Sequence, residues 1–290
     1  MTTEIRPLTD IHCLLGEGPV WSVAEQALYW IDIEAPALHR WSWGAGQTQT
    51  WSLPALVGAL AVRERGGLVL ALRTGIHTFD TVSGELTFVA DPEADLPGTR
   101  YNDGTVDPVG RFWIGGMVLT GDPKSAGLYR FSADGAATRM LSDLGCSNGI
   151  GFSPDGTLMY HTDTETKTIV RYDFDVATGD IEHPTVFVVD DDGNPDGLTV
   201  DADGFVWGAK WDGSRIVRYA PNGSIDRVVP LPVQRPTSLA FGGPDLRTLF
   251  ITTARIDLTP EELETQPLAG RLLVIDDAGV TGMPEPLTVL

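Results

Sequence analysis

The stretch Ser147-Asn148-Gly149-Ile150-Gly151-Phe152 places an oxygen-bearing side chain at the start of a short apolar segment. The same pattern recurs in three further fragments, namely Gly16-Glu17-Gly18-Pro19-Val20, Tyr101-Asn102-Asp103-Gly104-Thr105-Val106 and Pro195-Asp196-Gly197-Leu198-Thr199-Val200. A feature that returns at the same place in successive units is typical of a repeat architecture. The chain is therefore expected to consist of structural repeats.

The repeats have a regular length. A second apolar strand follows each opening segment, and these strands centre 39 to 47 residues apart, on Trp30, Val69, Trp113, Tyr160, Trp207 and Phe250. This spacing is within the range of four-stranded propeller blades. Turn signals stand between the apolar runs, at Pro108-Val109-Gly110, Pro154-Asp155-Gly156, Ala202-Asp203-Gly204 and Gly243-Pro244-Asp245. Asp-Gly favours a hairpin, because glycine tolerates the positive φ of a tight turn.

A third strand follows in every repeat, and most of these strands alternate apolar with polar residues, which is typical of a half-buried antiparallel strand. Examples are Ile169-Val170-Arg171-Tyr172 and Ile216-Val217-Arg218-Tyr219, and weaker fourth strands follow, such as Thr185 to Val189. Six such units fit the length. The sequence thus predicts an all-β fold, a six-bladed β-propeller with four-stranded antiparallel blades around a central channel, as one domain over residues 1–290. We expect Glu4 to Leu8 to complete the last blade and close the ring, which removes exposed sheet edges.

One helix is expected, between Ala254 and Pro267. Thr259 is a candidate N-cap, Pro260 occupies the first helical position, and Glu262 completes a capping box. These signals predict a short helix inserted in the last blade.

The composition argues against several classes of partner. The formal net charge is −20 at pH 7, which disfavours nucleic acid and anionic membrane surfaces by repulsion. Much of the acid is expected in solvated loops such as Asp190-Asp191-Asp192. The two cysteines, Cys13 and Cys146, form no disulfide framework, so we expect reduced thiols in a cytoplasmic protein. We expect no signal peptide and no membrane-spanning run, and a closed ring predicts a monomer.

Several catalytic motifs are absent from the sequence. It has no Gly-x-Ser-x-Gly nucleophile elbow, no phosphate-cradling glycine loop and no His-Glu-x-x-His zinc motif. The five histidines are scattered, and His39 and His77 fall in third strands, where we expect structural roles. His161 lies on a second strand and is expected to be a buried core or channel-wall residue. Ser/His/Asp catalysis therefore has little support.

The polar residues of the opening fragments suggest a metal site instead. In a ring, side chains at the first positions of the innermost strands converge on the axis, which would bring Glu17, Asn102, Asn148 and Asp196 together. One Glu, one Asn and one Asp give oxygen-only coordination that suits Ca²⁺, Mg²⁺, Mn²⁺ or Fe²⁺, and Zn²⁺ less typically. Asn-Gly and Asp-Gly also form turns, but their recurrence at one phase of a ring favours the metal site.

An open-site cation lowers the pKa of bound water and polarises a carbonyl oxygen. The natural reaction for such a site is hydrolysis of an ester-like carbonyl. We therefore expect a hydrolase that uses one divalent metal ion, whose identity (Ca, Zn, Mn, Mg or Fe) the sequence leaves open.

At these residues the chain resembles the senescence marker protein/regucalcin and gluconolactonase family of six-bladed propeller lactonases. The segments that carry the resemblance run in order along nearly the whole chain, as Leu15 to Trp21, Arg100-Tyr101-Asn102-Asp103-Gly104, Ser147-Asn148-Gly149, Tyr160-His161-Thr162-Asp163-Thr164, Pro195-Asp196-Gly197 and Phe241 to Asp245. Their combined specificity is high, although each alone would be weak. The Tyr160 to Thr164 segment is more similar to bacterial sugar-lactonase members than to animal ones.

The resemblance implies a role for each matching residue. Glu17, Asn148 and Asp196 would bind the metal, and Asp196 would also act as the general base or water-orienting group. Arg100 and Asn102 would hold the sugar hydroxyls. One position departs from the family, because Thr120 stands where some members carry a substrate-contacting Glu after the Gly-x-Met segment. That leaves the sugar preference open.

Lys210 and Trp211 follow the second strand of blade five and are further candidates to line the mouth of the site. The leading expectation is a sugar lactonase that hydrolyses a glucono-, galactono-, arabinono- or xylonolactone to its aldonic acid. Two alternatives remain open. One is a promiscuous organophosphate or aryl-ester hydrolase, since a metal polarises P=O as readily as C=O. The other is a calcium-binding propeller without catalysis.

Overall fold

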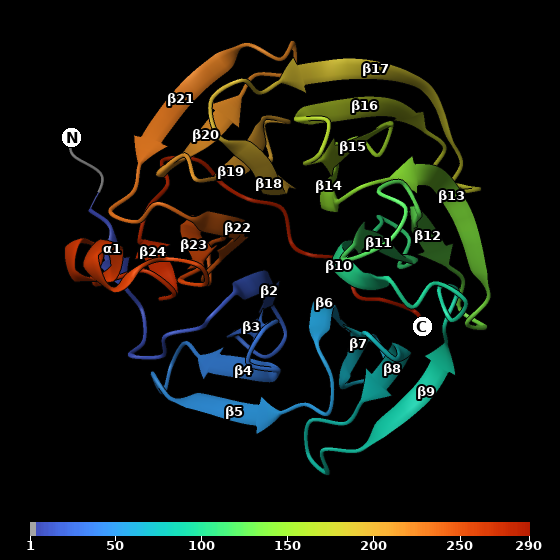
Figure 1. Ribbon diagram of the computed structural model, residues 1–290, viewed down its shortest axis with the longest axis horizontal. Coiled ribbons are helices and arrows are strands. Elements are labelled where there is room, and N and C mark those ends of the chain that lie inside the picture. Colours follow the sequence, from blue (N-terminus) through green and yellow to red (C-terminus); the bar gives the residue numbers. More distant parts are fainter. Residues whose placement is uncertain (1–3) are drawn as a thin grey trace.

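The computed structural model describes residues 4–290, which form six four-stranded antiparallel sheets arranged in a ring (Figure 1). In five sheets the strands follow in sequence order from the centre outward. The fold is nearly all-β and is a six-bladed β-propeller, as predicted. Its second strands contain all six residues on which the period was counted.

The first three blades occupy the N-terminal half. The first blade consists of β2 (Gly16–Ser22), β3 (Ala27–Asp32), β4 (Ala37–Ser42) and β5 (Thr48–Ser52). The second consists of β6 (Val57–Val62), β7 (Leu68–Leu72), β8 (Gly75–Phe79) and β9 (Leu86–Ala90). The third consists of β10 (Thr99–Val106), β11 (Phe112–Val118), β12 (Ala126–Phe131) and β13 (Ala137–Leu144).

The last three blades continue the ring. The fourth consists of β14 (Ser147–Phe152), β15 (Leu158–Asp163), β16 (Thr168–Phe174) and β17 (Ile181–Val189). The fifth consists of β18 (Asn194–Val200), β19 (Val206–Trp211), β20 (Arg215–Tyr219) and β21 (Ile225–Pro230). The sixth contains β22 (Pro236–Gly242), β23 (Thr248–Thr253), β24 (Leu273–Ile275) and, from the N-terminus, β1 (Arg6–Pro7).

The two ends of the chain close the ring, as expected. Strand β1 pairs with β24 through Arg6 opposite Val274 and Pro7 opposite Leu273, so the sixth sheet is shared between both termini. The predicted helix, α1 (Pro260–Thr265), lies between β23 and β24 and has the capping box of Thr259 and Glu262. Over residues 4–290 no helix is long and apolar enough to cross a membrane.

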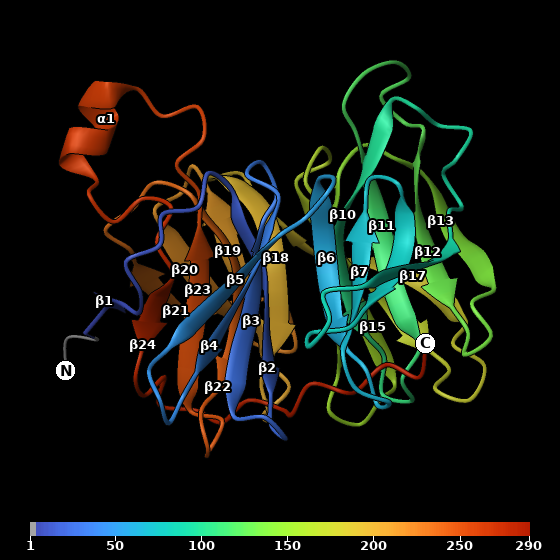
Figure 2. The same ribbon diagram turned by 90° about the horizontal axis from the view of Figure 1, so that it is seen from below.

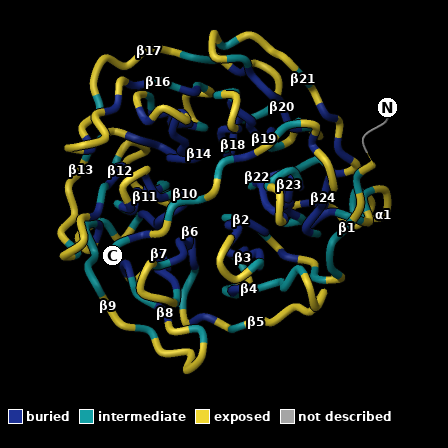
Figure 3. Tube along the Cα trace, turned by 180° about the vertical axis from the view of Figure 1, so that it is seen from behind, coloured by how far each residue is buried: buried dark blue, intermediate teal, exposed yellow. Residues whose placement is uncertain are grey.

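The core lies between the blades. The inner and second strands are almost entirely buried, whereas the outermost strands are mostly exposed or half-buried (Figure 3). Second-strand tryptophans Trp30, Trp113 and Trp207 are among the largest fully buried side chains, and each packs in a core cluster with residues of its own and a neighbouring blade. This packing explains why an apolar second strand marked each repeat so clearly in the sequence.

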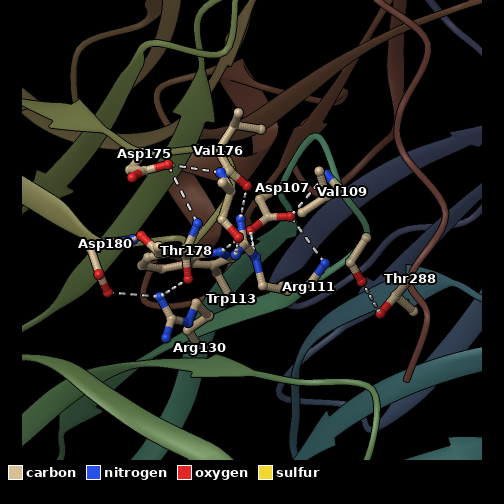
Figure 4. A network of polar contacts seen from close by, with 12 residues as sticks. Asp107, Val109, Arg111, Trp113, Arg130, Asp175, Val176, Thr178, Asp180 and Thr288 are labelled. Atoms are coloured by element: carbon tan, nitrogen blue, oxygen red, sulfur yellow. Dashed lines mark hydrogen bonds and ion pairs between the residues drawn. The ribbon is translucent and has the colours of Figure 1, made fainter.

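A buried aspartate organises the hairpin after two of the inner strands. Asp107 accepts hydrogen bonds from the backbone N–H of Val109 and Arg111, from the Arg111 side chain and from Trp113 Nε1 (Figure 4). Asp201 does the same in blade five, where it binds two backbone N–H groups, Trp207 Nε1 and Arg218. Each carboxylate therefore fixes a turn and a core tryptophan together.

The two ends of the ring differ. Thr253, the last residue of β23, pairs with Pro236, the first residue of β22, so α1 lies at the end where the inner strands begin. The C-terminal segment crosses the opposite end of the ring (Figure 2). There Thr288 N–H donates to Val62 O and Val289 N–H donates to Gly110 O.

Candidate functional site

All six inner strands have an irregular register at the same position. The pairing with the second strand shifts between Glu17 and Val20, and at the equivalent places in the other five blades, between Val57/Ala59, Tyr101/Gly104, Asn148/Ile150, Pro195/Leu198 and Pro236/Leu239. Each shift adds one residue to the inner strand, as in a β-bulge. Bulges re-aim side chains and are frequent beside active sites. The polar residues that recur in the sequence therefore lie in or beside six equivalent bulges near the start of the inner strands.

Glycine beside the polar residue lets neighbouring inner strands approach closely. A Cβ at Gly197 would lie 2.2 Å from Ser238 Oγ, and one at Gly58 would lie 2.1 Å from the backbone oxygen of Tyr101. In blade two, Gly58 stands in the bulge itself and contributes no side chain. The Asn-Gly and Asp-Gly pairs thus have a packing role in addition to the polar group that they present.

A continuous chain of hydrogen bonds joins blade three to blade four. Arg100 Nη1 donates to Asn102 Oδ1 at 2.6 Å, and Asn102 Nδ2 donates to Asn148 Oδ1 at 2.9 Å. All three side chains are buried. Arg100 Nε is also buried and has no hydrogen-bond partner within residues 4–290. The structure therefore brings together three of the predicted site residues and leaves a free donor among them.

Two of the predicted residues are buried carboxylates close to one another. Burial raises the pKa of Glu17 well above its ordinary value, and the charges of Asp196 and Asp103 raise it further. Burial and the charge of Asp103 also raise the pKa of Asp196. The hydrogen bond from the neighbouring Gly197 N–H and the positive charge of Arg100 oppose this shift. Within the described part of the chain neither carboxylate forms an ion pair. A cation is the group that would offset this concentration of charge.

Asp103 is a residue that the sequence analysis did not include in the site. It shares the blade-three bulge with Asn102, and its carboxylate accepts from Gly104 N–H at 2.7 Å. Burial raises the pKa of Asp103 to about 6. The signal was present in the fragment Asn102-Asp103-Gly104, but an extra bulge residue cannot be recognised from a strict alternation of strand faces.

A cavity of about 310 Å³ lies next to the site, toward the far end of the ring. It is lined by the later residues of five inner strands and by Met283 to Pro286 of the C-terminal segment, with Asp103 among its walls. Glu285 borders it and accepts a hydrogen bond from Thr105 Oγ1 at 3.0 Å. The centre of the ring is thus hollow between the carboxylates and the C-terminal segment.

The donor set suits a hard divalent cation. Two carboxylates and the amide oxygen of Asn148 are oxygen donors with a net charge of −2, and an amide oxygen has a second lone pair after accepting from Asn102. Residues 4–290 contain no group of three or more His, Cys, Asp or Glu side chains that could hold a metal ion. The candidate set differs from such a group because its third ligand is an amide.

The remaining predicted site residues, Thr120, Lys210 and Trp211, have other contacts. Thr120 is exposed in the loop after β11, where its N–H donates to Gly98 O, on the same end of the ring as the start of β10. Trp211 is half-buried and packs under the guanidinium of Arg235, 4.8 Å from its ring centroid. We expected Lys210 and Trp211 to follow the second strand of blade five, but both residues belong to that strand, β19.

The ion pair of Lys210 with Asp190 contradicts two expectations from the sequence, namely that Lys210 lines the mouth of the site and that Asp190 lies in a solvated loop. Lys210 is fully buried and its ammonium pairs with the Asp190 carboxylate, so Lys210 does not face an open mouth. Asp190 is buried as well, whereas Asp191 and Asp192 are both exposed. The acidic run is therefore not uniformly solvated, because its first residue neutralises a buried lysine in the next blade.

His161 is a buried core residue, as predicted. Its Nε2 lies 2.8 Å from Ser147 Oγ, and burial lowers its pKa to about 4. His39 is also buried and stacks on Trp30 with ring centroids 4.9 Å apart. Cys13 and Cys146 are free thiols and are buried.

The low pKa of His161 predicts a dependence of stability on pH. An unfolded histidine titrates near pH 6.5, so between about pH 6.5 and pH 4 the unfolded state binds a proton that the folded state does not. The free energy of unfolding should therefore fall as the pH decreases through this window. We expect His161→Gln to flatten this slope in urea unfolding at pH 7 and pH 5. An unchanged slope in the His161 variant would contradict a buried neutral imidazole.

The site and fold can be compared with known proteins. Residues 15–255 match the family model described as SMP-30/Gluconolactonase/LRE-like region. The chain belongs to this family. It is 41% identical over 276 residues to 6-deoxy-6-sulfogluconolactonase of Pseudomonas putida, and 94% of each chain is covered. It is 36% identical to a pentonolactonase of Haloferax volcanii, with 96% of each chain covered.

A solved structure has nearly the same fold over the whole chain. The calcium-binding protein regucalcin from Agrobacterium tumefaciens superposes with a TM-score of 0.95 at 32% sequence identity, and the match covers 100% of this chain and 98% of the other. The expected membership of the senescence marker protein/regucalcin and gluconolactonase family is therefore confirmed.

Proposed function

We propose that this chain is a metal-dependent sugar lactonase that hydrolyses an aldonolactone of the glucono-, galactono-, arabinono- or xylonolactone type to the aldonic acid. One observation carries the proposal. Two of six equivalent bulges bring buried Glu17 and Asp196 together, without an ion pair to either among residues 4–290, beside a hydrogen-bonded chain of Arg100, Asn102 and Asn148.

The reaction class is supported by the relatives. Proteins named as lactonases that act on sulfogluconolactone, pentonolactone and arabinolactone are 36 to 41% identical over at least 90% of their length. The chain is accordingly a gluconolactonase-like hydrolase of a cyclic ester, and a sugar lactone is its substrate class. Within this class, the proposed substrates are the four types of aldonolactone named above.

The proposed metal ligands are Glu17, Asn148 and Asp196. When bound there, a divalent cation would polarise the lactone carbonyl and lower the pKa of water. The structure of a relative named as a calcium-binding protein supports a divalent cation, and the oxygen-only donors favour Ca²⁺, Mg²⁺, Mn²⁺ or Fe²⁺ over Zn²⁺.

The side chains of this protein have separate roles in the proposed reaction. A carboxylate oxygen of Asp196 accepts a proton from the attacking water. Water oxygen bonds to the carbonyl carbon, the ring C–O bond breaks, and the ring oxygen takes up the proton. The proposed role of Arg100 is to bind a substrate oxygen, which is supported by its Nε, a buried donor without a partner among residues 4–290, and Asn102 holds Arg100 in position.

Acid release from a panel of aldono-1,4- and 1,5-lactones tests the proposed substrate class. An aryl ester and an organophosphate serve as comparison substrates. We expect turnover above the spontaneous rate with at least one aldonolactone and weaker turnover with the comparison substrates. Preferential hydrolysis of the aryl ester or organophosphate would contradict the proposal, as would cation binding without any turnover.

A further inference from the structure

The segment Tyr160 to Thr164 has no part in the proposed reaction, yet it lies beside the start of β14. His161 Nε2 contacts Ser147 Oγ, and Thr164 N–H donates to Cys146 O at 3.1 Å. Thr164 also contacts Asn148 directly, because Asn148 Nδ2 donates to Thr164 Oγ1 at 2.8 Å. The segment therefore holds the strand on which a proposed metal ligand lies.

The Thr164 hydroxyl joins two blades. Its Oγ1 donates to the backbone oxygen of Pro195 at 2.7 Å. Pro195 immediately precedes Asp196, so one hydroxyl contacts the Asn148 side chain in blade four and the backbone next to Asp196 in blade five. Asn148 and Asp196 are proposed ligands of the same cation, and Thr164 fixes their relative position.

The groups at the two ends of this chain of contacts, Pro195 O and the Arg100 guanidinium, determine the direction of each hydrogen bond between them. Pro195 O can only accept, so the single proton of the Thr164 hydroxyl must point at it, and the oxygen can then only accept from Asn148. Asn148 must therefore present Nδ2 to Thr164 and Oδ1 to the opposite side. At the other end Arg100 can only donate, which forces Asn102 to present Oδ1 to Arg100 and Nδ2 to Asn148.

We infer that Thr164 is a positioning residue for the proposed metal site, because together with Asn102 it holds the nitrogen of the Asn148 amide toward Thr164 and leaves the amide oxygen, on the Asn102 side, as the proposed metal ligand. This inference rests on the proposed function. Without the hydroxyl, the amide of Asn148 loses one of the two groups that distinguish its ends, the other being the Asn102 Nδ2 donor, so a rotation by about 180° that presents N–H groups to the cation becomes less unfavourable. Groups that orient metal ligands typically change metal affinity by about 10- to 100-fold when removed.

The test uses the metal-free protein of residues 1–290, three variants at Thr164 and one control variant. Thr164→Val keeps the shape and removes the hydroxyl, and Thr164→Ala does so without an added methyl in case valine disturbs folding. Thr164→Ser restores the hydroxyl. The matched control is Thr166→Val, because Thr166 lies two residues away, is exposed, and contacts only Asp163 O and Thr168 through its hydroxyl. Thermal unfolding of each variant establishes that it is folded.

Calorimetric titration with Ca²⁺ and with Mn²⁺ is the main readout. We expect Thr164→Val and Thr164→Ala to bind about 10-fold more weakly or worse, Thr164→Ser to recover most of the affinity, and Thr166→Val to match the wild type. At saturating cation, the kcat of Thr164→Val and Thr164→Ala should be closer to the wild-type value than their cation affinity is.

Two results would overturn the inference in distinguishable ways. If the wild type binds cations and hydrolyses lactones but Thr164→Val binds them equally well, the positioning role is wrong and the proposed function stands. If the wild type binds neither cation, the proposed metal site fails, and the role of Thr164 fails with it.

Discussion

Replacing Asp196 with asparagine is expected to lower kcat for lactone hydrolysis by roughly 10²- to 10⁴-fold, the usual contribution of a general base. An amide cannot accept the proton of the attacking water. The substitution also removes one of two negative charges from the proposed metal ligands, so cation affinity should fall. Activity of the variant is measured as acid release at saturating cation and lactone.

The same variant should be more stable than the wild type when both are metal-free. Burial and neighbouring charge raise the pKa of Asp196, so the wild type loses stability as the pH rises from about 3.9, the ordinary aspartate value, through the higher folded value. The amide side chain of the Asp196→Asn variant carries no charge to bury and avoids this loss. At pH 7 we expect the Tm of the metal-free variant to exceed that of the wild type, and added cation to raise only the wild-type Tm strongly.

The exposed Asp95→Asn is the control for both measurements, because it makes the same chemical change away from the site. Wild-type turnover in the Asp196 variant would refute the proposed mechanism. A lower Tm of the metal-free variant would show that the Asp196 carboxylate stabilises the fold, contrary to its place among like charges.

The second large effect concerns stability alone. Asp201→Ala is expected to destabilise the protein by about 3–5 kcal/mol, the usual cost of breaking a buried ion pair. The Asp201 side chain is 0% exposed, and its removal leaves Trp207 Nε1 and two backbone N–H groups without an acceptor. Arg218, itself 6% exposed, would lose its most buried ion pair and keep those with Asp203 and Asp226.

Asp203→Ala is the matched control, since Asp203 contacts the same guanidinium at 3.3 Å but its side chain is 66% exposed. Exposed ion pairs contribute about 0–1 kcal/mol. Urea unfolding at pH 7 measures both variants. Equal, small losses of unfolding free energy would show that the buried network in blade five does not stabilise the fold as described.

The ring could be predicted from the sequence because its signal is local and repeated. Each second strand is apolar around a large residue such as Trp113 or Trp207, and turns with glycine separate the apolar runs. The helix was predicted for the same reason, since Thr259, Pro260 and Glu262 satisfy each other within one turn. Short-range patterns of this kind do not depend on tertiary packing.

The site was only partly predictable, because its details depend on contacts between blades. Sequence phase selected Glu17, Asn102, Asn148 and Asp196 as candidates, but the bulge that adds Asp103 appears only in the pairing of β10 with β11. The ion pair of Lys210 with Asp190 joins residues 20 positions apart. No local pattern distinguishes such a buried lysine from one at the mouth of the site.

The polarity of the hydrogen-bonded chain was likewise invisible in the sequence. Thr164 belonged to a recognisable segment, yet its bond to Pro195 O crosses from blade four to blade five. Residue type alone does not show which end of an asparagine faces a neighbour. That information comes from the fixed donors and acceptors at the two ends of the chain of contacts.

The most direct test of the proposed metal-dependent lactonase is acid release from aldonolactones by chelator-stripped protein, before and after adding Ca²⁺, Mg²⁺, Mn²⁺, Zn²⁺ or anaerobic Fe²⁺ one at a time. We expect the stripped protein to fall to the spontaneous rate and at least one oxygen-preferring cation to restore turnover. Full activity of protein shown to be metal-free would contradict the proposed metal site.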